Sequence, residues 1–182
     1  YALFENNPDY TIHSCATSRC FFGQFNFESE IMQDQNVRKA IEMGVDKEGF
    51  CSVIMQGRGL PASAAFPDSF SYGNQAVETV SYDPEVAKAL LEESGWTDSD
   101  GDGYVDKDGE KLTVNWLTYP TRLEQPKLAE YAQATLKEIG IDVKVNNTSD
   151  HMTYQYGDRP EKLRRLSEQG SNGTDGETPS DL

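Results

Sequence analysis

Carboxylates recur at every second position in the middle of the chain, with the spacing of an EF-hand-like calcium loop. In such loops alternate side chains converge on the ion, a glycine permits the sharp turn, and one backbone carbonyl completes the ring of ligands. The spacing indicates calcium as the candidate cofactor, and no other cofactor is expected. Asp98, Asp100, Asp102, Gly103 and Asp106 occupy positions 1, 3, 5, 6 and 9, and the carbonyl oxygen of Tyr104 would be the ligand at position 7.

The same loop lacks the residue that closes a calcium site. Position 12, where a bidentate Glu should stand, is Gly109, and a strand-like run replaces the helix that should follow. Residues 98–110 carry six acids and one Lys, a net charge of -5 that disfavours tight folding without a cation. The alternative is a solvated Asp/Gly hairpin with local turn hydrogen bonds. We favour the hairpin, and both interpretations stay open.

Signals for catalysis are weak. No glycine-rich phosphate loop follows a strand, and no Ser lies in a Gly-x-Ser-x-Gly turn. With only two His, a Ser or Cys nucleophile has few candidate bases. Cys51 follows Phe50 in an expected helix, which favours a core position. We therefore expect a binding protein and not an enzyme.

The three cysteines do not define a disulfide framework or a zinc site. A bridge between Cys15 and Cys20 is sterically allowed, but free thiols, including Cys51, are the favoured interpretation. Neither His13 nor His151 makes a zinc site credible.

Composition excludes several partners. A chain of 182 residues with 36% hydrophobic content can bury the core of one domain. Its formal charge of -15 would repel a phosphate backbone or an anionic membrane surface, so no nucleic-acid partner is expected. No run approaches the roughly 18 apolar residues of a membrane helix. Residues 157–182 are polar and are expected to be a disordered tail or foreign to the fold.

The N-terminal half predicts one strand and one clear helix. Alternation over 20–27 suits a half-buried strand with an inward aromatic face. Apolar residues recur with helical spacing from Val37 to Val45, and Asp34 or Asn36 can cap this helix.

Asp46 can cap a second helix, which the glycines after residue 56 would end. Residues 60–80 predict an ordered loop. The inner positions of this second helix would be Phe50, Val53 and Ile54.

Asp83 and Pro84 are a strong helix start, because Asp caps the helix and Pro needs no N–H partner in the first turn. Gly95 would end this helix. Its expected buried stripe is Val86, Ala87, Leu90 and Leu91.

A strand, a helix and a second strand follow. They are expected over 112–116, 124–139 and 141–145. A helical crossover between two strands implies parallel pairing, and therefore an α/β layer.

Six blocks in this order resemble the extracellular solute-binding proteins that deliver oligopeptides, dipeptides or nickel complexes to ABC importers. The resemblance covers about residues 17–154. It is carried by Thr17-Ser18-Arg19 with Phe25-Asn26, the Asp-x-x-Val-Arg-x-Ala-Ile block of 34–47, Gly57 to Ala62, Tyr82 to Trp96, the Asp-Gly-Asp-Gly hairpin, and Ile139-Gly140-Ile141 with Val143.

The resemblance implies a three-layer periplasmic-binding-protein-like lobe with a mixed sheet flanked by helices. It implies an incomplete C-terminal lobe over 1–156, with Arg19, Asn26 and Tyr154 near the ligand. In the whole protein, two lobes would close on a peptide or metal chelate, as a Venus flytrap does, and present it to an ABC permease.

The resemblance also implies a location outside the cytoplasm, in the periplasm or on a bacterial cell surface, with a lipid anchor outside this chain. The alternative function is a calcium-dependent interaction module built on the 98–109 loop.

Overall fold

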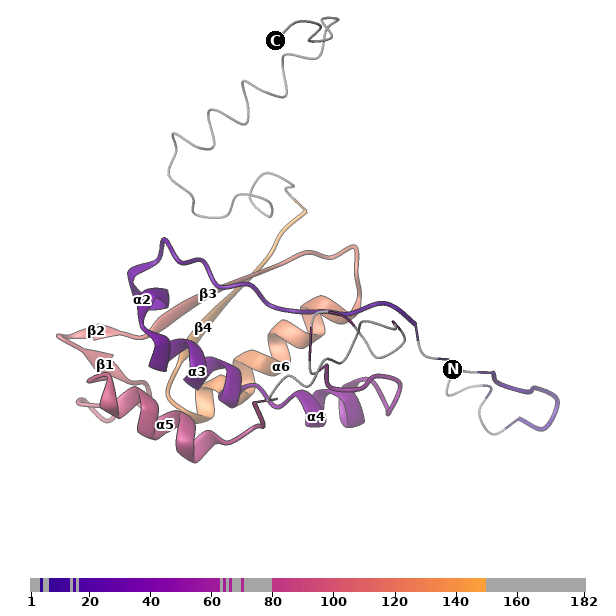
Figure 1. Cartoon of the computed structure of the whole chain (residues 1–182), viewed down its shortest axis with the longest axis horizontal. Coiled ribbons are helices and arrows are strands. Elements are labelled where there is room, and N and C mark those ends of the chain that lie inside the picture. The colour runs from indigo at the N-terminus through magenta and orange to yellow at the C-terminus, as the bar shows by residue number, and fades with distance from the viewer. Residues whose placement is uncertain are drawn as a thin grey trace, which may run out of the picture. The chain divides into compact units, whose positions relative to one another are not determined.

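The computed structural model describes residues 4, 7–13, 15, 17–62, 64, 66, 70 and 80–149, which divide into two units (Figure 1). One unit comprises residues 1–23 and 61–79, and the other 24–60 and 80–182. The described part of the first unit is irregular and includes an edge-to-face contact between Phe4 and Tyr10, with ring centroids 5.0 Å apart. Each unit is treated separately below.

The larger unit begins with a short helix, α2 (Glu30–Gln33), and the helix α3 (Gln35–Gly44). As predicted, Asp34 caps α3, because its side chain accepts a hydrogen bond from the backbone N–H of Asn36 at 2.8 Å. The buried stripe of α3 is also as predicted: it contains Val37, Ala40, Ile41 and Gly44.

A second helical stretch follows as α4 (Lys47–Gly49) and the π-helical turn η1 (Phe50–Ile54). Asp46 caps it, accepting from the Gly49 N–H at 2.8 Å. The other carboxylate oxygen of Asp46 accepts from the Tyr131 hydroxyl at 3.2 Å. Asp46 therefore fastens this stretch to the long helix that carries Tyr131.

The helix α5 (Pro84–Glu93) starts at the expected place, and the Asp83 side chain accepts from the Val86 N–H at 3.0 Å. α5 packs against α3. Ala87 and Leu91 are fully buried in this contact.

The predicted strand, helix and strand are present as β3 (Thr113–Thr118), α6 (Glu124–Glu138) and β4 (Asp142–Asn147). β3 and β4 pair in parallel, from Thr113 opposite Asp142 to Thr118 opposite Asn147. A separate antiparallel hairpin consists of β1 (Asp106–Lys107) and β2 (Glu110–Lys111). Within the described residues, the expected mixed pairing is thus divided between two two-stranded sheets, and the α/β class is confirmed.

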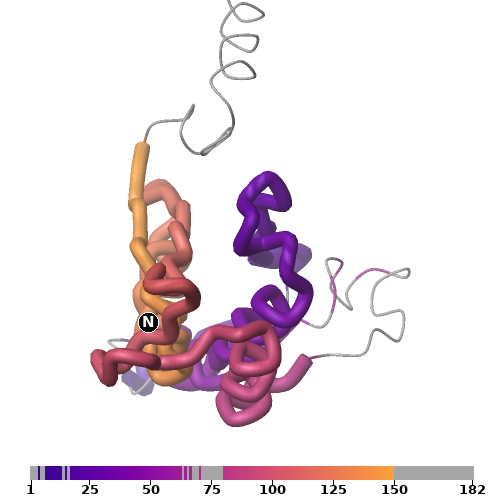
Figure 2. The backbone as a smooth tube through the Cα atoms, turned by 90° about the vertical axis from the view of Figure 1, so that its left-hand side faces the viewer, coloured from indigo at the N-terminus to yellow at the C-terminus, as the bar shows by residue number. Residues whose placement is uncertain are grey.

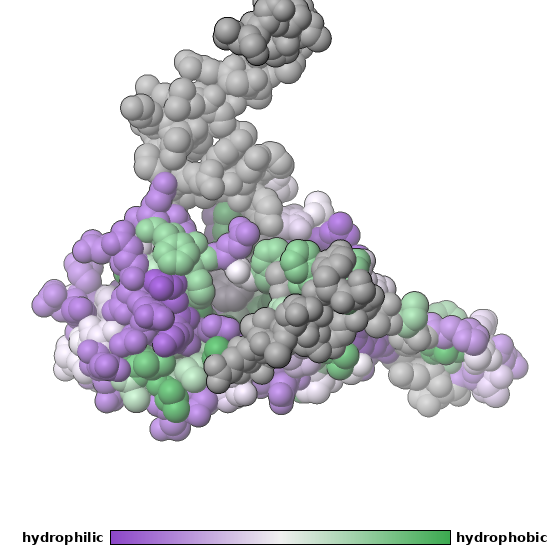
Figure 3. All heavy atoms as spheres, viewed as in Figure 1, coloured by the Kyte–Doolittle hydropathy of each residue, from purple (hydrophilic) through white to green (hydrophobic). Residues whose placement is uncertain are grey.

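The core lies where α3, α5 and α6 meet the inner face of the β3–β4 sheet. Figure 2 shows β4 and the end of α6, in orange, on one side of the view and the indigo segment with α2 and α3 on the other. Polar side chains cover much of the described surface in Figure 3. The largest fully buried side chains are Leu91, Leu112, Leu136, Ile139, Ile141 and Val37.

The strand predicted over 20–27 is wrong. These residues have no strand assignment, and Phe22 and Phe27 are 65% and 60% exposed. A strand is held by ladder hydrogen bonds to a neighbour, and no described strand pairs with this segment.

Two positions of the predicted helical stripes are also wrong. Val53 is 67% exposed, because the wider π-helical turn shifts the phase of the side chains after Phe50. Val86 is exposed because α5 packs mainly against α3, along a narrow stripe.

The expected tail, 157–182, lies outside the described residues, as do Tyr154 and His151. None of the described helices is long and apolar enough to cross a membrane. The three cysteines are free thiols; Cys51 is half-buried, and burial raises the pKa of its thiol.

Candidate functional site

The hairpin around residues 98–109 brings together three of the predicted metal ligands. Carboxylate oxygens of Asp98, Asp100 and Asp106 lie within 4.8 Å of one another. Asp98 and Asp100 are exposed, and Asp106 is half-buried. The loop therefore brings together the carboxylates at positions 1, 3 and 9 of the predicted calcium loop, but not the one at position 5.

The same carboxylates already accept hydrogen bonds within the loop. Asp98 accepts from the N–H groups of Gly101 at 2.7 Å and Gly103 at 3.0 Å. Asp106 accepts from the N–H and the hydroxyl of Ser99. These are the local turn contacts expected of an Asp/Gly hairpin.

Asp102, the predicted ligand at position 5, is not in this cluster. It forms an ion pair with Lys111, and its other oxygen accepts from the Tyr104 N–H at 3.0 Å. The hydrogen bond from Lys111 lowers the pKa of the Asp102 carboxyl. The Lys111 ammonium also lies 5.0 Å from the centroid of the Tyr104 ring. A cation at the cluster would have to compete with Lys111 for this carboxylate.

Gly109 stands where a calcium loop would have its closing Glu, and the structure gives the reason. Asp108 and Gly109 have φ values of 54° and 82° and join β1 to β2 as a two-residue turn. Positive φ at both central residues is the geometry of a type I′ hairpin turn, which favours Asp-Gly. The chain therefore returns as a strand at this point, and calcium binding by the loop stays a prediction.

Asn26, a predicted ligand-binding residue, lies in a tight turn of the larger unit. Its side-chain oxygen accepts from the Glu28 N–H at 3.1 Å, and its carbonyl oxygen accepts from the Ser29 N–H at 3.1 Å. The side chain is exposed. Asn26 is therefore held by its oxygen, and its side-chain nitrogen donates no hydrogen bond within the part of the chain that the structure describes.

Arg19, the second predicted residue, belongs to the smaller unit. Its backbone N–H donates to the Thr17 hydroxyl at 3.3 Å, and its guanidinium lies 5.8 Å from the centroid of the Phe21 ring. Tyr154, the third, lies outside the described residues. Arg19 and Asn26 fall in different units, so a shared ligand site of the three residues stays a prediction.

The carboxyl ends of β3 and β4 form an edge that sequence reasoning did not assign to ligand binding. In open α/β sheets, ligands bind beyond this edge of the strands. Thr118 and Asn147 are opposite one another there, and the Thr148 N–H donates to the Thr118 carbonyl at 3.0 Å. The predicted order of strand, helix and strand already implied a parallel pair, so the residues at the carboxyl ends of its strands could have been identified from the sequence.

The Thr118 hydroxyl is unusual among the described polar groups. Thr118 is 2% exposed, and its oxygen has no hydrogen-bond partner within the described part of the chain. Buried polar groups are usually satisfied, so such a group calls for an explanation.

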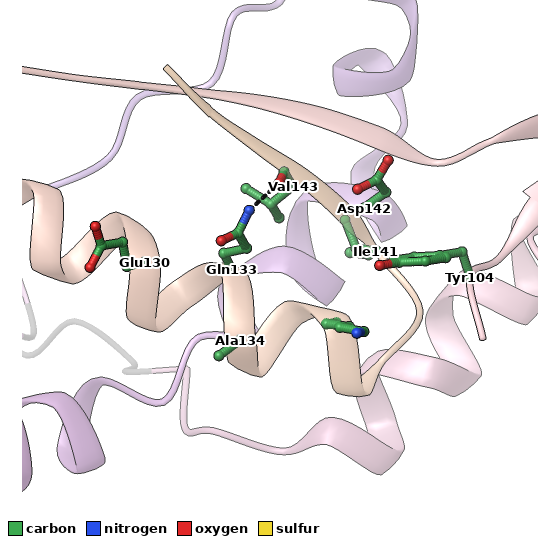
Figure 4. A pocket seen from close by; sticks show the side chains of 8 residues that line it. Tyr104, Glu130, Gln133, Ala134, Ile141, Asp142 and Val143 are labelled. Atoms are coloured by element: carbon green, nitrogen blue, oxygen red, sulfur yellow. Dashed lines mark hydrogen bonds between the residues drawn. The ribbon is translucent and has the colours of Figure 1, made fainter. Parts of the chain in front are cut away.

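A surface depression of about 270 Å³ lies between α6 and the start of β4 (Figure 4). The Gln133 side chain crosses it and donates to the Val143 carbonyl at 2.6 Å, which satisfies an outward-facing acceptor of β4. Its charged lining residues are two acids, Glu130 and Asp142, and one base, Lys137. Its lining residues are Tyr104, Glu130, Gln133, Ala134, Lys137, Ile141, Asp142 and Val143.

Comparison with known families gives one extensive match. The sequence profile of bacterial extracellular solute-binding proteins, family 5 Middle, matches residues 1–173.

Curated relatives include the oligopeptide-binding protein AppA of Bacillus subtilis, 34% identical over 134 residues, which are 71% of this chain and 24% of that protein. The nickel-binding periplasmic protein of Escherichia coli is 28% identical over 154 residues, 85% of this chain and 29% of that protein. The chain thus spans about a quarter of the length of these relatives.

Solved structures agree with the sequence matches. AppA from Bacillus subtilis, in complex with a nonapeptide, superimposes with a TM-score of 0.67 at 28% identity, covering 75% of this chain and 27% of that one. NikA from Brucella suis, in complex with Fe(III)-EDTA, gives a TM-score of 0.66 at 32% identity, covering 71% of this chain and 26% of that one. The fold of the described residues therefore recurs inside larger binding proteins.

Proposed function

Because this chain belongs to the bacterial extracellular solute-binding proteins of family 5, we propose that it is part of the substrate-binding component of an ABC importer. The component would bind a peptide or a nickel complex outside the cytoplasm and deliver it to a membrane permease. The observation that carries this proposal is the joint match of sequence and fold to AppA and NikA. We also infer a binding role and no catalytic one.

The chain would supply one side of the solute site. Relatives are about three times as long, so the other side would come from sequence beyond this chain. A site of that kind closes on its solute by a hinge motion between two lobes, because the closed form gains contacts that the open form lacks. Asn26 and the carboxyl edge of β3–β4 are the candidates for solute contact in the larger unit.

The proposal covers two classes of solute. Relatives are named for oligopeptides and for nickel. Peptides and amino-acid chelates of nickel both present carboxylate and carbonyl oxygens, which the side-chain N–H groups of Asn26 can bind. We place the protein in the periplasm or on the cell surface, held by a lipid anchor outside this chain.

An uptake assay tests the proposal. In a bacterium that carries the gene, its disruption should reduce the uptake of radioactive nickel or of a labelled oligopeptide, and a plasmid copy should restore it. A third labelled solute, such as glucose, serves as the control and should enter at the original rate. Unchanged uptake of both peptide and nickel would count against the proposal.

A further inference from the structure

Arg38, on α3, contacts both the end of α2 and the turn that carries Asn26. The guanidinium donates to the carbonyl oxygens of Met32 at 2.7 Å and Gln33 at 3.0 Å. Both carbonyls lie at the C-terminal end of α2, where helix carbonyls have no intrahelical partner. Arg38 therefore fixes the end of α2 against α3.

The same guanidinium lies over the ring of Phe27, 4.8 Å from its centroid. This distance is within the range of a cation–π contact. The Gln33 side chain adds a hydrogen bond to the Phe27 carbonyl at 3.4 Å. The residue next to Asn26 is thus held from two directions, although its ring is largely exposed to solvent.

Arginine is the side chain that can make these contacts together. Its planar fork presents several N–H donors in fixed directions, and its face stacks on an aromatic ring. Lysine would offer a point charge, which can approach the ring but cannot reproduce the fixed geometry of the two hydrogen bonds. The neighbouring Lys39 is exposed and forms no ion pair or side-chain hydrogen bond with the other described residues, so it provides a matched control.

We propose that Arg38 is a positioning residue for solute binding: it holds residues 26–33 in one conformation, so that the side-chain N–H groups of Asn26 meet an oxygen of the solute in a fixed place. This inference rests on the proposed function. Asn26 is the contact residue, and Arg38 acts through it by reducing the conformational freedom that binding would otherwise remove.

The test compares Arg38→Gln, Arg38→Lys and the control Lys39→Gln. In the 182-residue chain, nitrogen-15 relaxation reports the order of residues 26–29 and of the Asn26 side-chain amide. In the complete product of the gene, calorimetry reports affinity for a nonapeptide pool and for nickel–L-histidine. Melting temperatures separate a local effect from general destabilisation. Phe27→Leu is a milder variant that removes only the ring contact.

We expect Arg38→Gln to lower the order parameters of the turn from about 0.85 to below about 0.6 and to weaken solute binding about tenfold. Arg38→Lys should give an intermediate affinity, and Lys39→Gln should match wild type. Wild-type order in Arg38→Gln, or a loosened turn with unchanged affinity, would overturn the inference. Failure of wild type to bind either probe would instead count against the proposed function, and relaxation would still decide whether Arg38 holds the turn.

Discussion

Two residues, Gly109 and Lys111, determine which ligands the acidic hairpin could offer to a cation. Gly109 is required by the type I′ turn, so the closing ligand of a calcium loop is missing. Lys111 neutralises Asp102, which leaves three converging carboxylates that are already bonded to the loop backbone or to Ser99. The sequence predicted the approach of Asp98, Asp100 and Asp106 but wrongly placed Asp102 with them. The ion pair of Asp102 with Lys111 depends on the register of β1 and β2, which spacing alone does not reveal.

We therefore expect the melting temperature of the chain to depend little on calcium. Asp100→Asn removes a charge from the cluster while its amide oxygen can still accept from the Asp102 N–H, a bond of 3.1 Å in the structure. Glu110→Gln, which removes an exposed charge of the same hairpin outside the cluster, is the matched control. Melting should be measured with millimolar calcium and with chelator. A wild-type shift above about 5 °C, on the order of 1–3 kcal/mol for a chain of this size, that Asp100→Asn abolishes would show that the loop binds the ion.

The buried hydroxyl of Thr118 leads to a second prediction. Thr118→Val keeps the shape of the side chain and removes an unsatisfied polar group, so it should raise the free energy of unfolding by about 1 kcal/mol. Thr135→Val is the matched control, because the buried Thr135 hydroxyl donates to the Ala132 carbonyl at 3.3 Å. That control should lose about 1 kcal/mol.

Urea unfolding of wild type and of both threonine variants measures these changes in the free energy of unfolding. A loss of stability in Thr118→Val as large as that in Thr135→Val would show that the Thr118 hydroxyl has a partner in solution.

At the scale of the elements, the sequence predicted what local chemistry determines. Asp34, Asp46 and Asp83 each cap the helix they were expected to cap, because an N-cap needs only a side-chain oxygen and the next turn of backbone. The parallel pair β3–β4 followed from hydrophobic alternation on either side of a helix. The 20–27 segment could not be predicted in the same way, since its alternation describes a strand only if a neighbour supplies the ladder. The exposure of Val53 depended on a π-helical turn, which has no sequence signal here.

Asp34 caps α3 and accepts a hydrogen bond from Ser94 at the end of α5, so its carboxyl group links the stability of this contact to pH. Burial alone would raise its pKa, but hydrogen bonds from Ser94 and from the N–H groups of Asn36 and Val37 outweigh burial and leave the pKa below its usual value of 3.8. A folded-state pKa below the unfolded one contributes stability that is fully present above the unfolded pKa and is lost as the pH falls through the folded pKa.

Asp34→Asn keeps a side-chain oxygen that can cap the helix but removes the ionisable carboxyl group. The stability advantage of wild type over this variant should therefore shrink as the pH falls from about 5 through 3. Urea midpoints across this range measure it, and Glu42→Gln, an exposed change on α3, controls for general charge effects. An advantage that stays constant or grows with acid would contradict the assigned hydrogen bonds.

At the scale of the whole molecule, the order of the blocks predicted the family, and the profile match and the related structures confirm it. The solute site was less predictable. Its predicted residues fall in two units and in a segment outside the described residues, and their approach depends on parts of the fold that local spacing does not encode.

A solute site divided between this chain and a second lobe is incomplete in this chain alone. Pockets for small ligands usually enclose about 70–90% of the ligand surface, and one side of a cleft encloses far less. The chain should therefore bind neither a peptide nor a nickel chelate tightly, whereas the complete product of the gene should bind one of them.

Isothermal titration calorimetry of both proteins, with a nonapeptide pool and with nickel–L-histidine, tests this account most directly. The account predicts submicromolar binding of one of these solutes by the complete product, equivalent to more than about 8 kcal/mol, and no measurable heat from the 182-residue chain. Submicromolar binding by the chain alone would contradict the divided site, and no binding by the complete product would contradict the solute-binding function itself.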